Sequence, residues 1–327
     1  MEKKNLRNMN KVAVIGAVST TRVTLEKLVE HGFEIVAVLG HEPTNPNLVS
    51  GLEDLRALSK SLNIPFRGYT KINEDCLIDW VSGKQPDLLF AVGFSQLLSQ
   101  QWLDLPKIAT VGFHPTKLPK GRGRAPLAWL VLEEKQGAAN FFVMNENADD
   151  GPILASSSFD INKEDDAKEV ENKIIHATKK ALDNWLPELK QGYWNPIEQD
   201  FSKATWYGKR SPVDGLIDWT NTAEKIDRLV KASTDPHPGA YTFFNDNKLR
   251  IWKGCPDYEI PIKGVPGRVL LKENNMLLIQ TGTSPFWIKE FSLESEKKPN
   301  VGSLLGYSVQ EEIYKIYKLL NKLQNED

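Results

Sequence analysis

Cysteine is scarce in this sequence of 327 residues, which holds only Cys76 and Cys255. Two cysteines so far apart argue against a disulfide-stapled secreted fold and against a zinc-finger module, and they suit a reducing compartment. Long apolar runs are also missing, since no stretch approaches the ~18–20 residues that span a bilayer. The polar start of the chain lacks the apolar core of a secretory signal. We therefore expect a cytoplasmic protein with no membrane partner.

A surplus of positive charge is missing as well. Lys and Arg number 41 against 43 Asp and Glu, and the formal net charge is -2. The chain therefore has no global positive field to hold a polyanion, and we expect no nucleic-acid partner. The composition is otherwise ordinary for a globular protein, with 40% hydrophobic and 26% charged residues. The length suggests two domains, or one large domain with an appendage.

Several common active-site motifs are absent. The loop over 16–22 reads GAVSTTR, so it lacks the G-x-G-x-x-G fingerprint of dinucleotide-binding domains. The sequence also has no phosphate-binding P-loop, no G-x-S-x-G and no H-E-x-x-H. These absences argue against a plain Rossmann dehydrogenase and against a serine hydrolase.

The first half of the chain alternates between two kinds of apolar pattern. Apolar runs over 11–16, 33–40 and 87–93 predict buried strands, and leucines at helical spacing predict helices between them. This alternation indicates an α/β fold, with a mostly parallel sheet and helices on both of its faces. Ligands bind such sheets at the carboxyl ends of the strands, so we expect a site near the loops that follow these runs.

The pattern changes in the second half. Residues 164–191 show the spacing of an amphipathic helix, whereas 192–206 carry Gly, Trp and Asn-Pro, which are typical of a linker. Short strand-like runs between 248 and 282 then predict a small β-barrel. We expect five parts: a polar N-terminal tail (1–10), the α/β domain (11–191), a linker (192–206), a barrel-like domain (207–300) and a helical tail (301–327).

The stretch over 111–155 concentrates polar side chains that could do chemistry. His114 follows an apolar strand and precedes Pro115, which favours an extended backbone there, so we expect the imidazole at the carboxyl end of a strand. A turn with two carboxylates, over 149–152, lies near the end of the stretch. A loop rich in Gly and Pro between them suits a phosphate or carboxylate ligand. Its four cations are Lys117, Lys120, Arg122 and Arg124.

This stretch resembles the family of formyltransferases that use 10-formyltetrahydrofolate. Members carry a strand ending in Asn-x-His, then S-x-L-P-x-x-R-G, a helix, and a strand ending in x-D-x-G. The corresponding residues here lie over 112–114, 116–119, 122–123 and 149–151. The resemblance covers most of the chain and continues in two segments, 210–219 and 235–243, that look like the start of the second domain in methionyl-tRNA and sugar formyltransferases. It is closest to the branch that formylates amino sugars, which includes the pseudaminic-acid type.

The resemblance implies attack of a neutral amine on a formyl carbon. His114 is then the acid/base, and Asp149 orients or charges it, while Asp150 is a turn carboxylate. The family Asn, which is thought to polarise the formyl oxygen, is Gly112 in this chain. Either a backbone N–H or the Thr116 hydroxyl supplies the missing donor, or the protein is a weakened relative. Loss of one such donor costs ~10²–10³ in rate, which does not abolish catalysis.

The resemblance also implies which residues bind the reactants. It implies a Rossmann-like catalytic domain, an OB-like second domain through which relatives dimerise, and no metal ion. The co-substrate 10-formyltetrahydrofolate is expected against Phe90, Gly93, Phe94, Ser95, Gln96, Leu97, Asn147, Asp149 and Ile153. The acceptor is expected against Lys117, Lys120, Arg122 and Arg124.

The identity of the acceptor stays open among several classes. A tRNA substrate requires a basic surface, but residues 205–327 hold 17 Lys and Arg against 16 Asp and Glu. A purine-pathway transformylase is usually a single domain. An amino sugar, either nucleotide-linked or a nonulosonic acid, suits the basic loop best. A weakened folate-binding relative and a hydrolase that releases formate are the alternatives from other functional classes.

Overall fold

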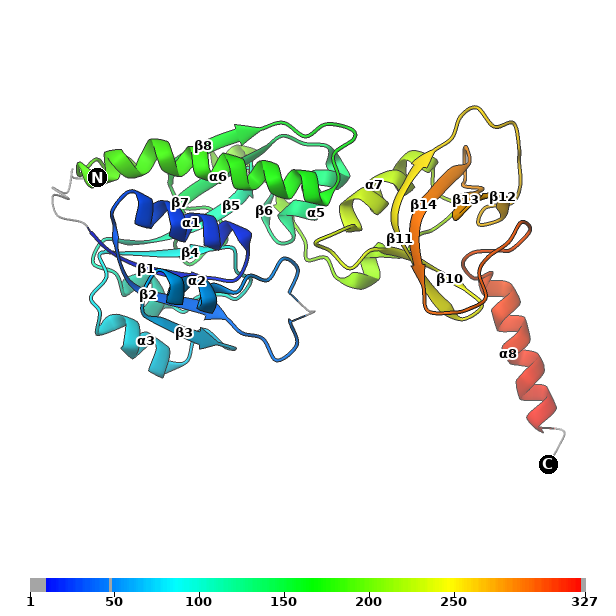
Figure 1. Cartoon of the computed structure of the whole chain (residues 1–327), viewed down its shortest axis with the longest axis horizontal. Coiled ribbons are helices and arrows are strands. Elements are labelled where there is room, and N and C mark those ends of the chain that lie inside the picture. The colour runs from blue at the N-terminus through cyan, green and yellow to red at the C-terminus, as the bar shows by residue number, and fades with distance from the viewer. Residues whose placement is uncertain (1–9, 47–48, 325–327) are drawn as a thin grey trace. The chain divides into compact units, whose positions relative to one another are not determined.

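The computed structural model describes residues 10–46 and 49–324. It divides the chain into two units, residues 1–210 and 211–327, which are described here one at a time (Figure 1). None of the helices within the described ranges has the length and apolarity needed to cross a bilayer.

Unit 1 is built on a seven-stranded sheet in the order β3-β2-β1-β4-β5-β7-β8. The pairings among the first five strands are parallel, whereas β7 pairs antiparallel with both β5 and β8. The mostly parallel sheet expected from the sequence is thereby confirmed. The strands are β1 (Lys11–Gly16), β2 (Glu34–His41), β3 (Phe66–Tyr69), β4 (Leu88–Val92), β5 (Ala109–Thr116), β7 (Gly137–Val143) and β8 (Ile153–Phe159).

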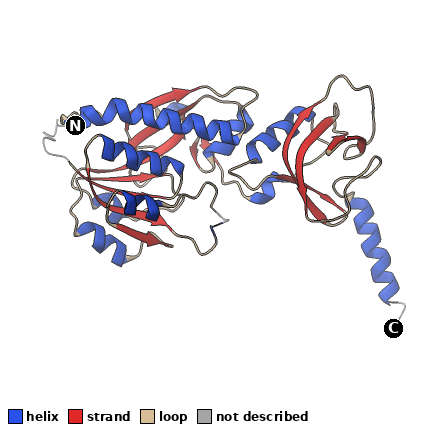
Figure 2. Ribbon diagram, viewed as in Figure 1, coloured by secondary structure: helices blue, strands red, loops and turns tan. Residues whose placement is uncertain are grey.

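Helices cover both faces of this sheet (Figures 1 and 2). Apolar side chains of α1 and α6 join one core with the sheet, and those of α3 and α4 join a second core on the other face. The longest helix, α6, begins at a capping box in which Asp166 and Glu169 satisfy each other's backbone amides. The helices are α1 (Ser19–Glu30), α2 (Leu55–Ser61), α3 (Asp75–Ser82), α4 (Gln100–Asp104), α5 (Pro126–Glu133) and α6 (Ala167–Lys190).

The segment expected to be a linker, 192–206, is instead part of unit 1. It contains a short 3₁₀ helix, η2 (Phe201–Lys203), and leads into β9 (Trp206–Tyr207). Strand β9 pairs in parallel with β6 (Arg122–Gly123) of the loop after β5. Because these backbone pairings need the segment in place, the expected domain boundary at residue 191 is corrected to residue 210.

Unit 2 contains the separate β domain and the terminal helix that the sequence predicts. Its five strands form an antiparallel sheet in the order β10-β11-β14-β13-β12, in which β10 and β12 are the edges among the described residues. Helix α7 begins at Thr222, which caps it, and buries Ile226 and Val230 against the sheet. The elements are η3 (Pro212–Gly215), α7 (Ala223–Ser233), β10 (Ala240–Phe244), β11 (Asn247–Pro256), β12 (Val269–Glu273), β13 (Met276–Ile279), β14 (Phe286–Leu293) and α8 (Val309–Gln324).

Candidate active site

The imidazole of His114 and the carboxylate of Asp149 form the centre of the site. His114 lies near the carboxyl end of β5, and its Nδ1 is 3.3 Å from Asp149 Oδ2. Asp149 belongs to the turn between β7 and β8, and its φ of 55° lies in the left-handed region, where a non-glycine residue is strained. The side chain of His114 is 5% exposed and that of Asp149 is 18% exposed. Asp149 is therefore the member of the pair that reactants can reach more easily.

The loop after β5 fixes both members of the pair through its backbone. The Nε2 of His114 donates to the carbonyl of Gly121 at 2.8 Å, which leaves Nδ1 to face the carboxylate. The amide of Gly123 donates to Asp149 Oδ2 at 2.8 Å. Gly123 has a φ of 105°, and a Cβ there would lie 2.5 Å from the carbonyl oxygen of Tyr207. Only glycine permits this close approach, so Gly123 of the R-G motif is needed to bring its backbone amide to Asp149.

A buried amide, that of Gln199, holds the turn that carries Asp149. Its Nε2 donates to the carbonyls of Asp149 at 2.9 Å and Gly151 at 2.7 Å. Its Oε1 accepts from Arg122 Nη2 at 2.9 Å. The Arg122 guanidinium also lies 4.7 Å from the centre of the Phe201 ring. The segment between α6 and β9 therefore holds the turn that carries Asp149, a role that its linker-like composition did not reveal.

A second buried amide, that of Asn140, bonds to backbone carbonyls where the pairing of β5 with β7 is interrupted beside the site. Pro115 has no amide hydrogen, and the pairing of β5 with β7 shifts register between His114 and Thr116. Asn140 Nδ2 donates to the carbonyls of His114 at 3.0 Å and Ala138 at 2.8 Å, and also to that of Thr116. The signal that could have identified this residue is a single amide in the otherwise apolar strand GAANFFV.

An open hollow adjoins the turn that carries Asp149. It has a volume of about 370 Å³, with Gln100, Leu103 and Asp104 of α4 on one side and residues 144–147 on the other. Leu97, in the loop between β4 and α4, is 85% exposed. The side chain of Leu103 and several amide and carboxylate groups are therefore available to a ligand in this hollow.

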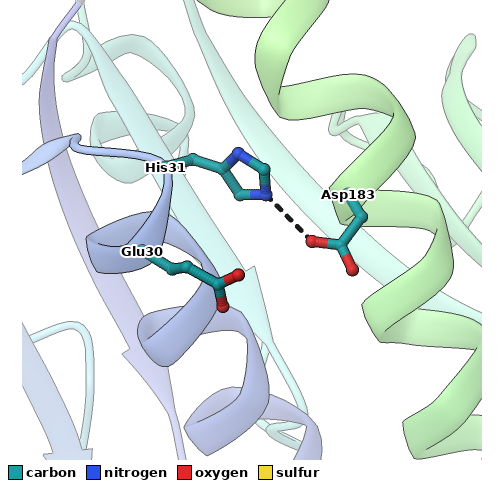
Figure 3. Close-up of side chains that lie close together, drawn as sticks. All are labelled: Glu30, His31 and Asp183. Carbon is teal, nitrogen blue, oxygen red and sulfur yellow. Dashed lines mark hydrogen bonds and ion pairs between the residues drawn. The ribbon is translucent and has the colours of Figure 1, made fainter.

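A separate group of titratable side chains joins α1 to α6 (Figure 3). His31 Nε2 lies 2.9 Å from Asp183 Oδ1, and Lys27 Nζ lies 2.9 Å from both Asp183 Oδ1 and Glu30 Oε2. Partial burial opposes ionisation of Asp183, but hydrogen bonds from His31 and Lys27 outweigh it and hold the pKa of this carboxyl below its usual range. Because the Lys27 ammonium already pairs with both carboxylates, we interpret this group as a contact between two helices.

Two family descriptions match the chain over most of its length. "Formyl transferase" matches residues 10–186, and "Formyl transferase, C-terminal domain" matches residues 209–307. The chain belongs to the formyl transferase family. The resemblance carried by the motif around His114 is thereby confirmed. Neither description reaches residues 187–208, which hold Gln199, or the residues after 307, which hold α8.

Several solved structures share the fold. HypX from Aquifex aeolicus, in complex with tetrahydrofolic acid, gives a TM-score of 0.63 at 18% identity, with 90% of this chain and 46% of that chain covered. This chain thus spans less than half the length of HypX. An N-formyltransferase from Helicobacter canadensis, in complex with folinic acid and dTDP-3-aminofucose, gives 0.62 at 15%, with 87% and 100% covered. Methionyl-tRNA formyltransferase from Clostridium thermocellum gives 0.54 at 18%, with 77% and 95% covered.

The structure changes the interpretation of the missing family Asn. A Cβ on Gly112 would lie 2.6 Å from Phe142 Cζ and 2.8 Å from Met144 Cγ, so these side chains fill the space beside that position. The hydroxyl of Thr116 has one proton to donate, and its partners are the carbonyls of Lys120 at 2.7 Å and Gly121 at 3.2 Å. The expectation that Thr116 replaces the lost oxyanion donor is therefore corrected, because its proton is already engaged.

The four cations of the loop fall into two groups. Arg122 is only 2% exposed, so the expectation that it binds the acceptor is corrected: it is a buried support for Gln199. Lys117, Lys120 and Arg124 are exposed, and the Lys117 ammonium contacts the side chain of Gln136. The exposed three stay predictions for the acceptor site.

The side chains of two expected folate-binding residues, Phe90 and Gln96, have structural roles. Phe90 is fully buried in the core, with ring centres 6.2 Å from Phe141 and 6.0 Å from Trp185. The Gln96 side chain is hydrogen-bonded at both ends to the backbone between β3 and α3. Its Oε1 accepts from the amide of Ile72 at 2.9 Å, and its Nε2 donates to the carbonyl of Thr70 at 2.7 Å. The expectation for Phe90 is corrected on these grounds, whereas a contact of the folate with the Gln96 backbone stays a prediction.

The other expected folate-binding residues stay predictions. Gly93 ends β4 with a φ of 62°, Phe94 packs partly on the core, and Ser95 and Leu97 are exposed beyond it. Asn147 is exposed and lines the hollow. Ile153 is half-buried at the start of β8, where it bridges to Ile197.

Proposed function

We propose that the protein transfers a formyl group from 10-formyltetrahydrofolate to the amine of an amino sugar, either nucleotide-linked or a nonulosonic acid. The observation that carries this proposal is the contact between His114 Nδ1 and Asp149 Oδ2 at 3.3 Å. The pair lies within the segment that matches the formyl transferase family. A carboxylate and an imidazole in contact, one of them open to solvent, can accept and return a proton.

The proton steps follow from which group is exposed. An attacking amine must lose a proton, and the tetrahedral oxyanion that forms must be stabilised. Asp149 takes this proton, and His114 shares it through Nδ1 until it passes to the leaving nitrogen. The amide of Gly123 and the side chain of Gln199 keep the carboxylate in position for both transfers. Since Thr116 is engaged, we assign what remains of the oxyanion stabilisation, with one donor fewer than in the family pattern, to a backbone N–H.

The residues near Asp149 suit the co-substrate. When bound, 10-formyltetrahydrofolate supplies the electrophilic formyl carbon. A flat heteroaromatic ring needs an apolar contact and a few polar groups that fix its orientation. Leu103 of the hollow offers the first, and Asn145, Glu146 and Asn147, which also line it, offer the second.

Charge supports an anionic sugar as the acceptor. Lys120 and Arg124 are exposed on the loop that also holds His114 in place, and cations of this kind bind phosphate or carboxylate. Residues 205–327 have nearly balanced charge, which disfavours a tRNA partner. The similar protein from Helicobacter canadensis is described with a nucleotide-linked amino sugar, which supports this class of acceptor.

A screen of amino sugars with 10-formyltetrahydrofolate tests the proposal. We expect saturable turnover with an anionic amino sugar, and at least a ~10²-fold loss in His114→Asn and Asp149→Asn proteins that remain folded. The control is the melting temperature of each variant, which separates loss of chemistry from loss of fold.

The alternative functions are tested by adding methionyl-tRNA and a reaction without any acceptor to the same screen. Efficient formylation of methionyl-tRNA, with no turnover on any amino sugar, would overturn the acceptor and leave formyl transfer standing. Formate release that needs no acceptor would indicate a hydrolase. Folate binding without turnover would indicate a weakened relative.

A further inference from the structure

Strand β9 carries an exposed indole beside the candidate active site. Trp206 is 65% exposed, although tryptophan side chains are largely buried in most folded proteins. The backbone on either side of it is bonded to the loop after β5. The amide of Arg122 donates to the carbonyl of Thr205 at 2.9 Å, and the amide of Arg124 donates to the carbonyl of Tyr207 at 3.1 Å. The backbone that carries the indole is therefore fixed, and the ring remains in water.

The pairing of β6 with β9 places this indole close to the catalytic pair. Trp206 lies opposite Arg122 in the register of the two strands. The next residue of β6, Gly123, donates its amide to Asp149 Oδ2 at 2.8 Å. Because paired strands lie ~4.8 Å apart, the backbone of Trp206 is no more than ~10 Å from the carboxylate of Asp149. The ribose and two phosphates that separate the base from the sugar in a nucleotide-linked sugar span a distance of this order.

The exposed cations of the same loop suit those phosphates. Among the described residues, the side chains of Lys120 and Arg124 have no hydrogen-bonded or ionic partner. Pro119, which precedes Lys120, accepts from the amide of Thr205 at 3.3 Å. The two cations therefore flank the stretch of backbone that pairs with Trp206, and side chains of this kind bind phosphate. A surface ring beside unpaired cations is the combination that holds a nucleotide.

We propose that Trp206 stacks on the base of a nucleotide that carries the amino sugar, while Lys120 and Arg124 bind its phosphates. This assignment rests on the proposed formyl transfer. It selects the nucleotide-linked acceptor over a free nonulosonic acid, which has a carboxylate but no flat ring. The Arg122 guanidinium lies 5.9 Å from the centre of the indole, near the limit of a cation–π contact, so the backbone pairing sets the position of the ring. Neither family description reaches residues 187–208, so the indole lies outside the family pattern.

Calorimetric titration of the full-length protein with dTDP, UDP, GDP and CMP tests the stacking without any turnover. We expect saturable binding of at least one of the four. Trp206→Ala should weaken it ~5–150-fold, the range for a base stacked on an aromatic ring, and Trp206→Phe should retain most of the affinity. Tyr193→Ala is the matched control and should bind as wild type does, because Tyr193 is 64% exposed but belongs to neither β6 nor β9. Inorganic pyrophosphate, which has no base, should not distinguish wild type from Trp206→Ala.

Kinetics separate a failure of the stacking from a failure of the proposed function. With a nucleotide-linked amino sugar, Trp206→Ala should raise the KM and leave kcat unchanged, because stacking is the same in the ground state and the transition state. Binding that depends on Trp206 in a protein that never transfers formyl would refute the proposed function alone. Three results would overturn the stacking and leave formyl transfer standing: no binding of any of the four nucleotides, equal weakening by Trp206→Ala and Tyr193→Ala, or a free nonulosonic acid as the better acceptor.

Discussion

Replacing Gln199 with leucine tests whether its amide, rather than its bulk, positions the catalytic turn. The change removes a bond accepted from the Arg122 guanidinium, worth ~1.5–3 kcal/mol, and two bonds donated to carbonyls, worth ~0.5–1.5 kcal/mol each. The total of ~2.5–6 kcal/mol is a large part of the ~5–15 kcal/mol by which a typical domain is stable. We therefore expect Gln199→Leu to fold, with a clearly lower Tm.

The same substitution should slow the reaction. The two lost donors hold the backbone of Asp149, whose φ of 55° is left-handed and strained. A catalytic group displaced by ~1 Å can cost ~10² in rate, so we expect kcat to fall by that order. Gln199→Glu separates the two effects, because a carboxylate still pairs with Arg122 but offers the turn no donor. Because its second oxygen then faces the carbonyls of Asp149 and Gly151, only part of the Tm should recover, while kcat stays low.

Gln280 of unit 2 provides the control. It is 5% exposed where Gln199 is 6%, it donates to the carbonyls of Thr281 and Thr283, and it accepts from the amide of Gly264. Gln280→Leu should lower the Tm comparably and leave kcat unchanged. Steady-state formyl transfer and calorimetry on the same samples make the comparison. Wild-type kcat in folded Gln199→Leu and Gln199→Glu proteins would refute the positioning role.

Arg122→Ala should lower the Tm without raising the KM for the acceptor. Arg124→Ala should raise that KM at least ~10-fold, since an arginine–anion bond contributes ~1.5–3 kcal/mol. A raised KM in Arg122→Ala and an unchanged KM in Arg124→Ala would return Arg122 to the acceptor site. Burial opposes ionisation of Asp87, but backbone amides at the start of β1 outweigh it and lower the pKa of this carboxyl. Its contribution to stability is then present above the unfolded pKa and lost as pH falls through the folded pKa, so Asp87→Asn should flatten the acid limb of stability measured by urea unfolding. Gly112→Asn should destabilise by ~1–3 kcal/mol through overpacking against Phe142, and the same change should cost less in a protein that already carries Phe142→Ala. An unchanged Tm in the single variant would contradict the packing.

The order of elements in unit 1 is readable from the sequence because burial decides it. Strands such as β1 (KVAVIG) and β4 (LLFAV) are buried along nearly their whole length, and a central strand of a parallel sheet must be apolar on both faces. The segment over 192–206 was misread for the opposite reason. Its strand β9 has only two residues, and its anchors are single polar contacts that no periodic pattern records.

The site was only partly predictable, because the type of a residue does not determine whether its side chain is buried or exposed. Arg122 and Arg124 are two residues apart in one cationic loop, yet the first is buried and the second exposed. In a continuous strand the two side chains would share a face, but β6 ends at Gly123 and Arg124 lies beyond it, which is apparent only once the extent and pairing of β6 are known. Phe90 reads equally well as a pocket wall or as core, and its position in the middle of β4 decides for core.

Backbone groups explain how the pair can survive the loss of the family Asn at Gly112. Asp149 is held by the amide of Gly123 and, through its own carbonyl, by Gln199, and His114 is held by the carbonyl of Gly121. None of these contacts involves residue 112, so its side chain can be absent while the proton-transfer geometry stays intact. The loss then falls on the oxyanion, where one missing donor costs ~10²–10³ in rate. A chain that keeps the pair and lacks one donor is expected to be a slower formyl transferase rather than an inactive one.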